Sequence, residues 1–108
     1  MLGDKEENVM AKQITPAEVE RQLQDCKDLS IIDVRESAEL LSGKIPGARN
    51  ISFTQLALRK DELDKETNYV VVCQSGNRSK AACGILEALG FNAVNMTGGM
   101  NDWRGELE

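Results

Sequence analysis

A cysteine and an arginine stand close together in one short polar segment, residues 73–79, which reads Cys-Gln-Ser-Gly-Asn-Arg-Ser. β-branched and aromatic residues precede it at 69–72, and apolar residues at helical spacing follow it at 80–89. This pattern predicts that a buried strand ends at Cys73 and passes through a tight loop into a helix. Free backbone N–H groups and the positive end of a helix stabilise a thiolate and a bound anion at such a junction. The segment therefore predicts a cysteine nucleophile in an anion-binding loop.

The other residues of this loop suit the binding of a substrate anion. Gly76 permits the backbone angles that turn successive N–H groups inward. Arg78 provides a positive fork that can hold an oxyanion or brace the loop. Ser75 and Ser79 have short hydroxyls that can cap the helix and donate toward Cys73. We expect substrate-binding residues at every position after the cysteine, namely Gln74, Ser75, Gly76, Asn77, Arg78 and Ser79.

The chain contains no histidine, so a cysteine–histidine catalytic pair is excluded and the loop itself must activate Cys73. A thiolate there can attack a polarisable sulfur and keep it as a persulfide, because a departing sulfite or thiolate is a stable anion that needs little proton donation. The alternative is that Cys73 is a core residue, since free cysteine is often buried. We interpret Cys83 as a core cysteine and Cys26 as an exposed thiol at a helix end.

Composition narrows the class of protein. The chain has 108 residues, of which 41% are hydrophobic and 29% charged, with a net charge of −5, which indicates one domain and gives nucleic-acid binding no electrostatic support. No apolar run approaches the ~20 residues needed to span a membrane, and residues 1–10 read as a frayed tail without a signal peptide. We expect a cytoplasmic protein with free thiols, no metal and no cofactor, whose domain covers residues 11–104 and is followed by a tail at 105–108.

Predicted strands and helices alternate along the chain. We expect strands at 12–14, 29–34, 49–52, 69–72 and 93–96, and helices beginning after Thr15 and at 36–41, 54–63 and 80–89. This alternation favours a three-layer α/β/α fold with a mainly parallel five-stranded sheet. Ligands bind at the carboxyl ends of such strands, where both Asp33 and Cys73 are expected. Asp33 and Arg35 are therefore either supports of the loop or a structural ion pair.

Four segments of the chain occur in an order that resembles a known family. They are Asp33-Val34-Arg35 followed by Glu39, the turn Gly-Lys-Ile-Pro-Gly-Ala-Arg-Asn at 43–50, the loop at 73–79, and Gly-Gly-Met-Asn-Asp-Trp at 98–103. These are similar to the Asp-x-Arg signature, the Gly-His-Ile-Pro-Gly-Ala-x-Asn turn, the active-site loop and the terminal Gly-Gly-x-x-x-Trp motif of the single-domain rhodaneses. The resemblance covers about residues 11–104 and implies the rhodanese-like fold.

The resemblance implies a sulfurtransferase in which Cys73 forms the persulfide, residues 74–79 cradle it, and Asp33 and Arg35 support the loop. Its partners would be thiosulfate or persulfide donors and thiophilic acceptors such as cyanide, a thiol or a protein. Lys44 replaces the usual histidine of the turn. Gln74, Ser75 and Glu39 stand where efficient thiosulfate users carry basic residues, which predicts weaker holding of a dianion.

Three other functions stay open beside this one. Rhodanese-like modules also serve as non-catalytic binding or regulatory domains, although many of those have lost the cysteine. Phosphatases and arsenate reductases of similar fold place five residues between cysteine and arginine, whereas four separate Cys73 from Arg78. A sulfur carrier would share the persulfide chemistry but hand its sulfur to a protein partner.

Overall fold

Five parallel strands form the centre of the computed structural model, which describes residues 12–108. In the order β1-β5-β4-β2-β3 they are Lys12–Ile14, Asn92–Met96, Asn68–Val72, Ser30–Asp33 and Arg49–Asn50. The register places Val72 of β4 beside Asp33 of β2, and Val71 beside Asn95 of β5. The carboxyl ends of the three middle strands therefore meet at one edge of the sheet, which positions Cys73 next to both neighbours.

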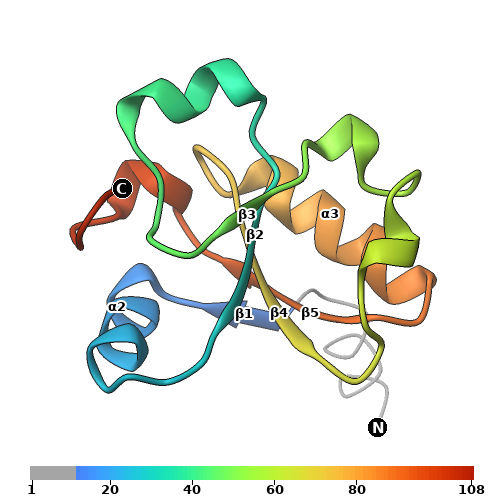
Figure 1. The fold of residues 1–108 in the computed structure, drawn as a ribbon, viewed down its shortest axis with the longest axis horizontal. Helices are drawn as coiled ribbons and strands as arrows, with labels where there is room; N and C mark the ends of the chain where they lie inside the picture. Colours follow the sequence, from blue (N-terminus) through green and yellow to red (C-terminus); the bar gives the residue numbers. More distant parts are fainter. Residues whose placement is uncertain (1–11) are drawn as a thin grey trace, which may run out of the picture.

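Helices cover both faces of this sheet. Helix α2 (Pro16–Gln24) lies on one side and α3 (Asn77–Ala88) on the other (Figure 1). Four short 3₁₀ helices complete the structure: η1 (Ser37–Ser42), η2 (Phe53–Gln55), η3 (Lys60–Glu62) and η4 (Gly99–Asp102). The first turn of α2 forms as the sequence indicates, because the Thr15 side chain accepts a hydrogen bond from Glu18 N at 3.1 Å and Pro16 stands at the start of the helix. The three-layer α/β fold with a parallel sheet is confirmed.

Side chains of β4 alternate between two hydrophobic clusters, one on each face of the sheet. Tyr69, Val71 and Cys73 pack with residues of α3, whereas Val70 and Val72 pack in the cluster that contains Val19 of α2 and Trp103. The alternation follows from the two-residue period of a strand. Because β4 is buried on both faces, the residue that follows it is held by a rigid element.

The predicted helix at 54–63 is wrong. The chain instead forms η2 and η3 with a turn between them. Leu56 is fully buried, but Leu58 is 78% exposed, so the segment lacks the continuous apolar face that stabilises a helix in a protein. The short 3₁₀ helices bury Leu56 without requiring a continuous apolar face.

The chain end folds back onto the turn at 44–47. Trp103 Nε1 donates to the carbonyl of Glu106 at 2.9 Å, and the Glu108 carboxylate accepts hydrogen bonds from Lys44 Nζ at 2.7 Å and from Gly47 N at 3.2 Å. The predicted tail at 105–108 is thus in contact with the domain, and the predicted tail at 1–10 lies outside the described residues. Within residues 12–108, no helix is both long and apolar enough to cross a membrane.

Candidate active site

The loop between β4 and α3 turns at Gly76, the N-cap of α3. Its φ of 98° lies in the left-handed region that glycine tolerates, and a Cβ there would lie 2.9 Å from Gly98 N. No side chain makes the usual N-cap hydrogen bond. The sulfur of Cys73 takes that place, because it accepts hydrogen bonds from Gly76 N at 3.1 Å and from Ser79 N at 3.3 Å. One N–H group at the N-cap and one in the first turn of the helix therefore point at the cysteine.

The Cys73 side chain has no exposed surface, and its Sγ lies 3.3 Å from the hydroxyl of Ser79. Burial raises the pKa of the thiol, whereas the hydrogen bond between the thiol and the Ser79 hydroxyl and those from the N–H groups of Ser79, Gly76 and Ser75 lower it. The donors prevail, so the pKa of Cys73 lies below the ordinary value for cysteine. Ser75 and Asn77 have exposed side chains at the tip of the loop, whereas Ser79 is buried beneath it.

The other two cysteines lie in different surroundings. Cys83 is fully buried in α3, where burial and the nearby Glu87 carboxylate raise the pKa of its thiol to about 12. Cys26 is exposed after the end of α2, with a positive φ of 62°. The prediction of a core cysteine and an exposed thiol is confirmed for this pair.

Asp33 and Arg35 form a buried ion pair with an Nη2–Oδ2 distance of 2.8 Å. Arg35 also donates to the carbonyl of Gly43 at 2.9 Å and to Gln74 Oε1 at 3.2 Å. Asn50 Nδ2 donates to the carbonyls of both members of the pair, each at 2.9 Å. The pair therefore joins the 43–50 turn to the first residue after Cys73, which makes it both structural and a direct contact of the loop.

Arg78 is held by a carboxylate of the 3₁₀ helix η1. Its two terminal nitrogens each donate to Glu39 at 2.8 Å, and the Glu39 carboxylate also accepts a hydrogen bond from Glu36 N at 2.8 Å. Arg78, followed by this backbone hydrogen bond, lowers the pKa of Glu39 to about 2. Glu39 is therefore ionised at neutral pH and cancels the charge of Arg78 at the mouth of the loop.

The Gly98-Gly99 turn braces the loop from behind. Met100 N donates to the carbonyl of Cys73 at 2.8 Å, and Asn101 N donates to the carbonyl of Gln74 at 2.9 Å. A Cβ on Gly99 would lie only 2.5 Å from the Cys73 carbonyl oxygen. Glycine at this position thus lets η4 approach the loop closely enough to satisfy its backbone carbonyls.

Asn95 is a site residue that the sequence interpretation missed. Its amide is 97% buried, accepts a hydrogen bond from the Ser79 hydroxyl and donates to the carbonyl of Gly76 at 3.4 Å. A polar amide within the predicted strand 93–96 was the available signal, because asparagine is disfavoured in strands and a buried amide requires partners. The two partners of Asn95 both lie in the loop.

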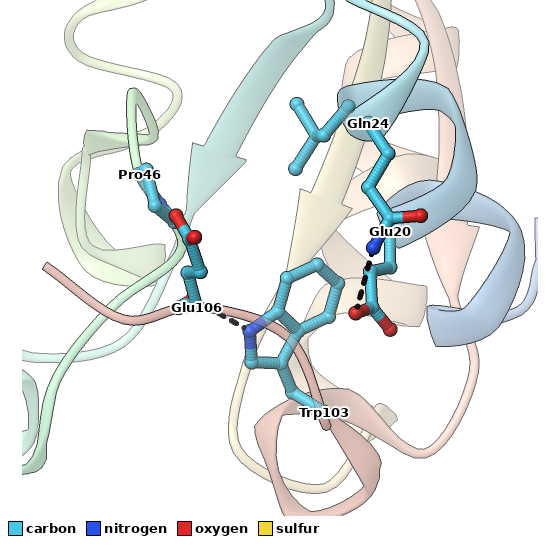
Figure 2. Close-up of a pocket in the computed structure, with 6 residues that line it drawn as sticks. Glu20, Gln24, Pro46, Trp103 and Glu106 are labelled. Carbon is cyan, nitrogen blue, oxygen red and sulfur yellow. Dashed lines mark hydrogen bonds between the residues drawn. The ribbon is translucent and has the colours of Figure 1, made fainter.

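Two pockets adjoin the folded-back chain end, and only one of them has predicted site residues in its walls. One of about 380 Å³ lies beside Trp103, between α2 and the folded-back chain end, and its walls include Pro46, Glu106 and the Gln24–Glu20 pair (Figure 2). It contains none of the predicted site residues. A smaller pocket of about 210 Å³ includes Arg35 and Gln74 among its walls. The smaller pocket is therefore the one that adjoins the Asp33–Arg35 pair and the first residue after Cys73.

The fold and the loop together define an α/β domain that presents a cysteine at a strand–helix junction. A model of the rhodanese-like domain matches residues 15–106. The chain is 39% identical to YtwF of Bacillus subtilis, which carries a provisional sulfurtransferase name, over 90% of this chain and 94% of that protein. It is 33% identical to the thiosulfate sulfurtransferase GlpE of Pseudomonas putida over 82% of each.

A crystal structure of a rhodanese-like domain protein from Staphylococcus aureus has the same fold. Its TM-score is 0.85 at 38% identity, with 90% of this chain and 96% of that chain covered. The chain belongs to the rhodanese-like family, and it has relatives that bear sulfurtransferase names.

Proposed function

We propose that this protein transfers sulfane sulfur through a persulfide on Cys73. The Cys73 thiolate attacks the outer sulfur of thiosulfate, the bond to the sulfonate sulfur breaks, and sulfite leaves with the electron pair. An acceptor such as cyanide or a thiolate then attacks the terminal sulfur. The Cys73 S–S bond breaks and its electron pair returns the cysteine to the thiolate.

The arrangement of donors around Cys73 Sγ is the observation that carries this proposal. Two backbone N–H groups point at the sulfur within 3.3 Å, at the start of an α-helix. They stabilise the thiolate that attacks and the anion that the acceptor step regenerates. Neither step needs a side-chain acid, because every leaving group is a stable anion.

The neutral mouth of the loop supports a persulfide as the favoured donor. Arg78 is paired with Glu39, and Gln74 contributes an uncharged amide that binds Asn101 at 2.8 Å. A dianion such as thiosulfate therefore meets little unpaired positive charge. Thiosulfate would be usable but weakly held, and a low-molecular-weight or protein persulfide would serve better. The free thiol that the reaction requires fits a reducing compartment such as the cytoplasm.

The same geometry argues against the competing functions. A phosphatase loop needs its arginine for the phosphate oxygens, whereas both terminal nitrogens of Arg78 are bound to Glu39. A binding module would need no thiol with a lowered pKa, which Cys73 has. A sulfur carrier would use the same persulfide, so that function differs only in the acceptor.

Steady-state kinetics with thiosulfate or glutathione persulfide as donor and cyanide or a thiol as acceptor test this proposal. We expect parallel double-reciprocal lines, because donor and acceptor react in separate half-reactions. Cys73→Ser should abolish turnover, and Cys83→Ala, the matched control in the same hydrophobic cluster, should retain it. Turnover by Cys73→Ser would show that another residue carries the sulfur.

A further inference from the structure

Asn95 connects two residues that both contact Cys73. Its Oδ1 accepts a hydrogen bond from Ser79 Oγ, and its Nδ2 donates to the Gly76 carbonyl at 3.4 Å. Ser79 and Gly76 are also two of the residues whose N–H groups donate to Cys73 Sγ. Asn95 comes from β5, so a neighbouring strand is hydrogen-bonded to both of these residues.

The Gly76 carbonyl fixes the orientation of the Asn95 amide. A carbonyl oxygen only accepts hydrogen bonds, so the NH₂ group of Asn95 must face it and Oδ1 must face Ser79. That oxygen accepts as well, and Ser79 must therefore donate its single hydroxyl hydrogen to Asn95. The hydroxyl oxygen then presents a lone pair to the Cys73 thiol, 3.3 Å away.

Ionisation of Cys73 creates a conflict within this network. When the thiol proton leaves to solvent, the sulfur becomes an acceptor, and two acceptors then face one hydroxyl hydrogen. We propose that Asn95 is a positioning residue that competes with the Cys73 thiolate for the hydroxyl hydrogen of Ser79 and so restrains ionisation of the resting site. The backbone N–H groups are fixed donors, which leaves the hydroxyl as the adjustable one. The inference rests on the proposed role of Cys73 as the nucleophile.

Replacing Asn95 by a neutral residue leaves unchanged the charged groups around Asn95, Ser79 and Cys73. They are Arg78 of α3 with Glu39 of η1, the Asp33–Arg35 pair after β2, and Asp102 of η4 beside Gly98. Strands β4 and β5 contribute no charged side chain. Substitution of Asn95 by a neutral residue therefore changes hydrogen bonding at Ser79 without changing the charges.

The test is the pH dependence of Cys73 alkylation, followed by mass spectrometry of the Cys73 peptide in the full chain. Asn95→Leu should lower the apparent pKa of Cys73 and raise the alkylation rate at mildly acidic pH by about tenfold, the effect of one hydrogen bond to a charged group. Asn95→Asp should shift the apparent pKa of Cys73 upward, because a carboxylate holds the hydroxyl hydrogen and adds negative charge.

Ser79→Ala in both backgrounds separates this competition from a structural role. The double variant Asn95→Leu/Ser79→Ala should not show the faster alkylation of Cys73 that Asn95→Leu gives. The single and the double variant both lack the Asn95 hydrogen bond to the Gly76 carbonyl, so loss of that bond cannot explain the difference. If Asn95→Leu fails to fold, Asn95→Val, which suits a strand, replaces it. An upward shift of the Cys73 pKa with Asn95→Leu, or a gain that survives Ser79→Ala, would overturn the proposal. Alkylation needs no sulfur donor, so failure of sulfur transfer would be seen separately.

Discussion

Cys73 and Cys83 show that burial alone does not set the chemistry of a thiol. Neither side chain has exposed surface, yet the pKa of Cys73 is lowered and that of Cys83 is raised to about 12. The difference lies in the donors, because hydrogen bonds from the loop outweigh burial at Cys73. At Cys83 burial comes first and Glu87 adds to it. The loop therefore lowers the pKa of a thiol that is as buried as a core residue.

This difference predicts the order of alkylation. The lowered pKa keeps a larger fraction of Cys73 as thiolate as the pH falls, so its alkylation rate should have a midpoint below the ~8.5 of a free cysteine. Cys83 should stay unmodified in the folded protein over the same range, because its thiol is protonated. Peptide mass mapping after brief exposure to iodoacetamide between pH 5 and 9 measures both. Labelling of Cys83 ahead of Cys73 would contradict the assignment.

Residue identity and spacing were enough to predict that Cys73 follows a strand and precedes a tight loop and a helix, and that Asp33 and Arg35 lie at the same edge of the sheet. They were not enough to predict what the loop residues bind. Arg78 lies 39 positions from Glu39, and Ser79 lies 16 positions from Asn95. Such pairs depend on how strands and turns pack together, and no local pattern encodes them.

The 3₁₀ helix η4 can hydrogen-bond to the loop because glycine lets the two segments approach closely. At Gly99 the φ of +61° and the Cβ position 2.5 Å from the Cys73 carbonyl both oppose any larger residue. Gly99→Ala should therefore reduce stability and displace the Cys73 backbone, so sulfur transfer should fall by more than the loss of folded protein explains.

Gly47→Ala is the matched control, because Gly47 has a φ of +83° with no atom within 4 Å of the added Cβ. It should cost about 1 kcal/mol for the left-handed backbone alone and leave activity per folded molecule unchanged. Gly99→Ala should cost roughly 1–3 kcal/mol more, as expected for overpacking. Chemical denaturation and specific activity measure both effects. Equal behaviour of the two variants would show that η4 does not position the loop.

The sequence was enough to predict the helices and strands that have a continuous buried face. It was not enough to predict the conformation of the segment at 54–63, which has none. The apolar run before Cys73 and the helical spacing after it both match the structure as β4 and α3. The segment 54–63 was predicted as a helix, but the exposure of Leu58 shows that its leucines do not form one buried stripe. In this segment the fully buried leucine is Leu56. The conformation of such a segment depends on tertiary contacts rather than on its local sequence.

At the scale of the whole molecule, the alternation of strands and helices predicted the parallel sheet. The strand order was left open, because many orders are compatible with the same alternation. The return of the chain end was also missed, since Lys44 and Glu108 are 64 positions apart. Contacts between distant segments of this kind complete the fold around the loop.

The pairing of Arg78 with Glu39 leads to a prediction about how tightly the protein binds thiosulfate. Glu39→Gln keeps a side-chain oxygen for the Glu36 N–H but releases Arg78, so the Michaelis constant for thiosulfate should fall several-fold. Asp61→Asn is the control, because it removes the same charge from a side chain that is 95% exposed in η3. The gain from Glu39→Gln should shrink as salt rises. Equal effects of both substitutions would locate the cause in net charge rather than in Arg78.

Sulfur bound to Cys73 is the most direct measure of the proposed mechanism. The protein is incubated with glutathione persulfide or thiosulfate without an acceptor, and its intact mass and Cys73 peptide are then determined. We predict a gain of one sulfur atom on Cys73, absent from Cys73→Ser, retained by Cys83→Ala and removed by cyanide. A sulfur atom located on Cys26 or Cys83 instead, or no gain with either donor, would contradict a persulfide relay through Cys73.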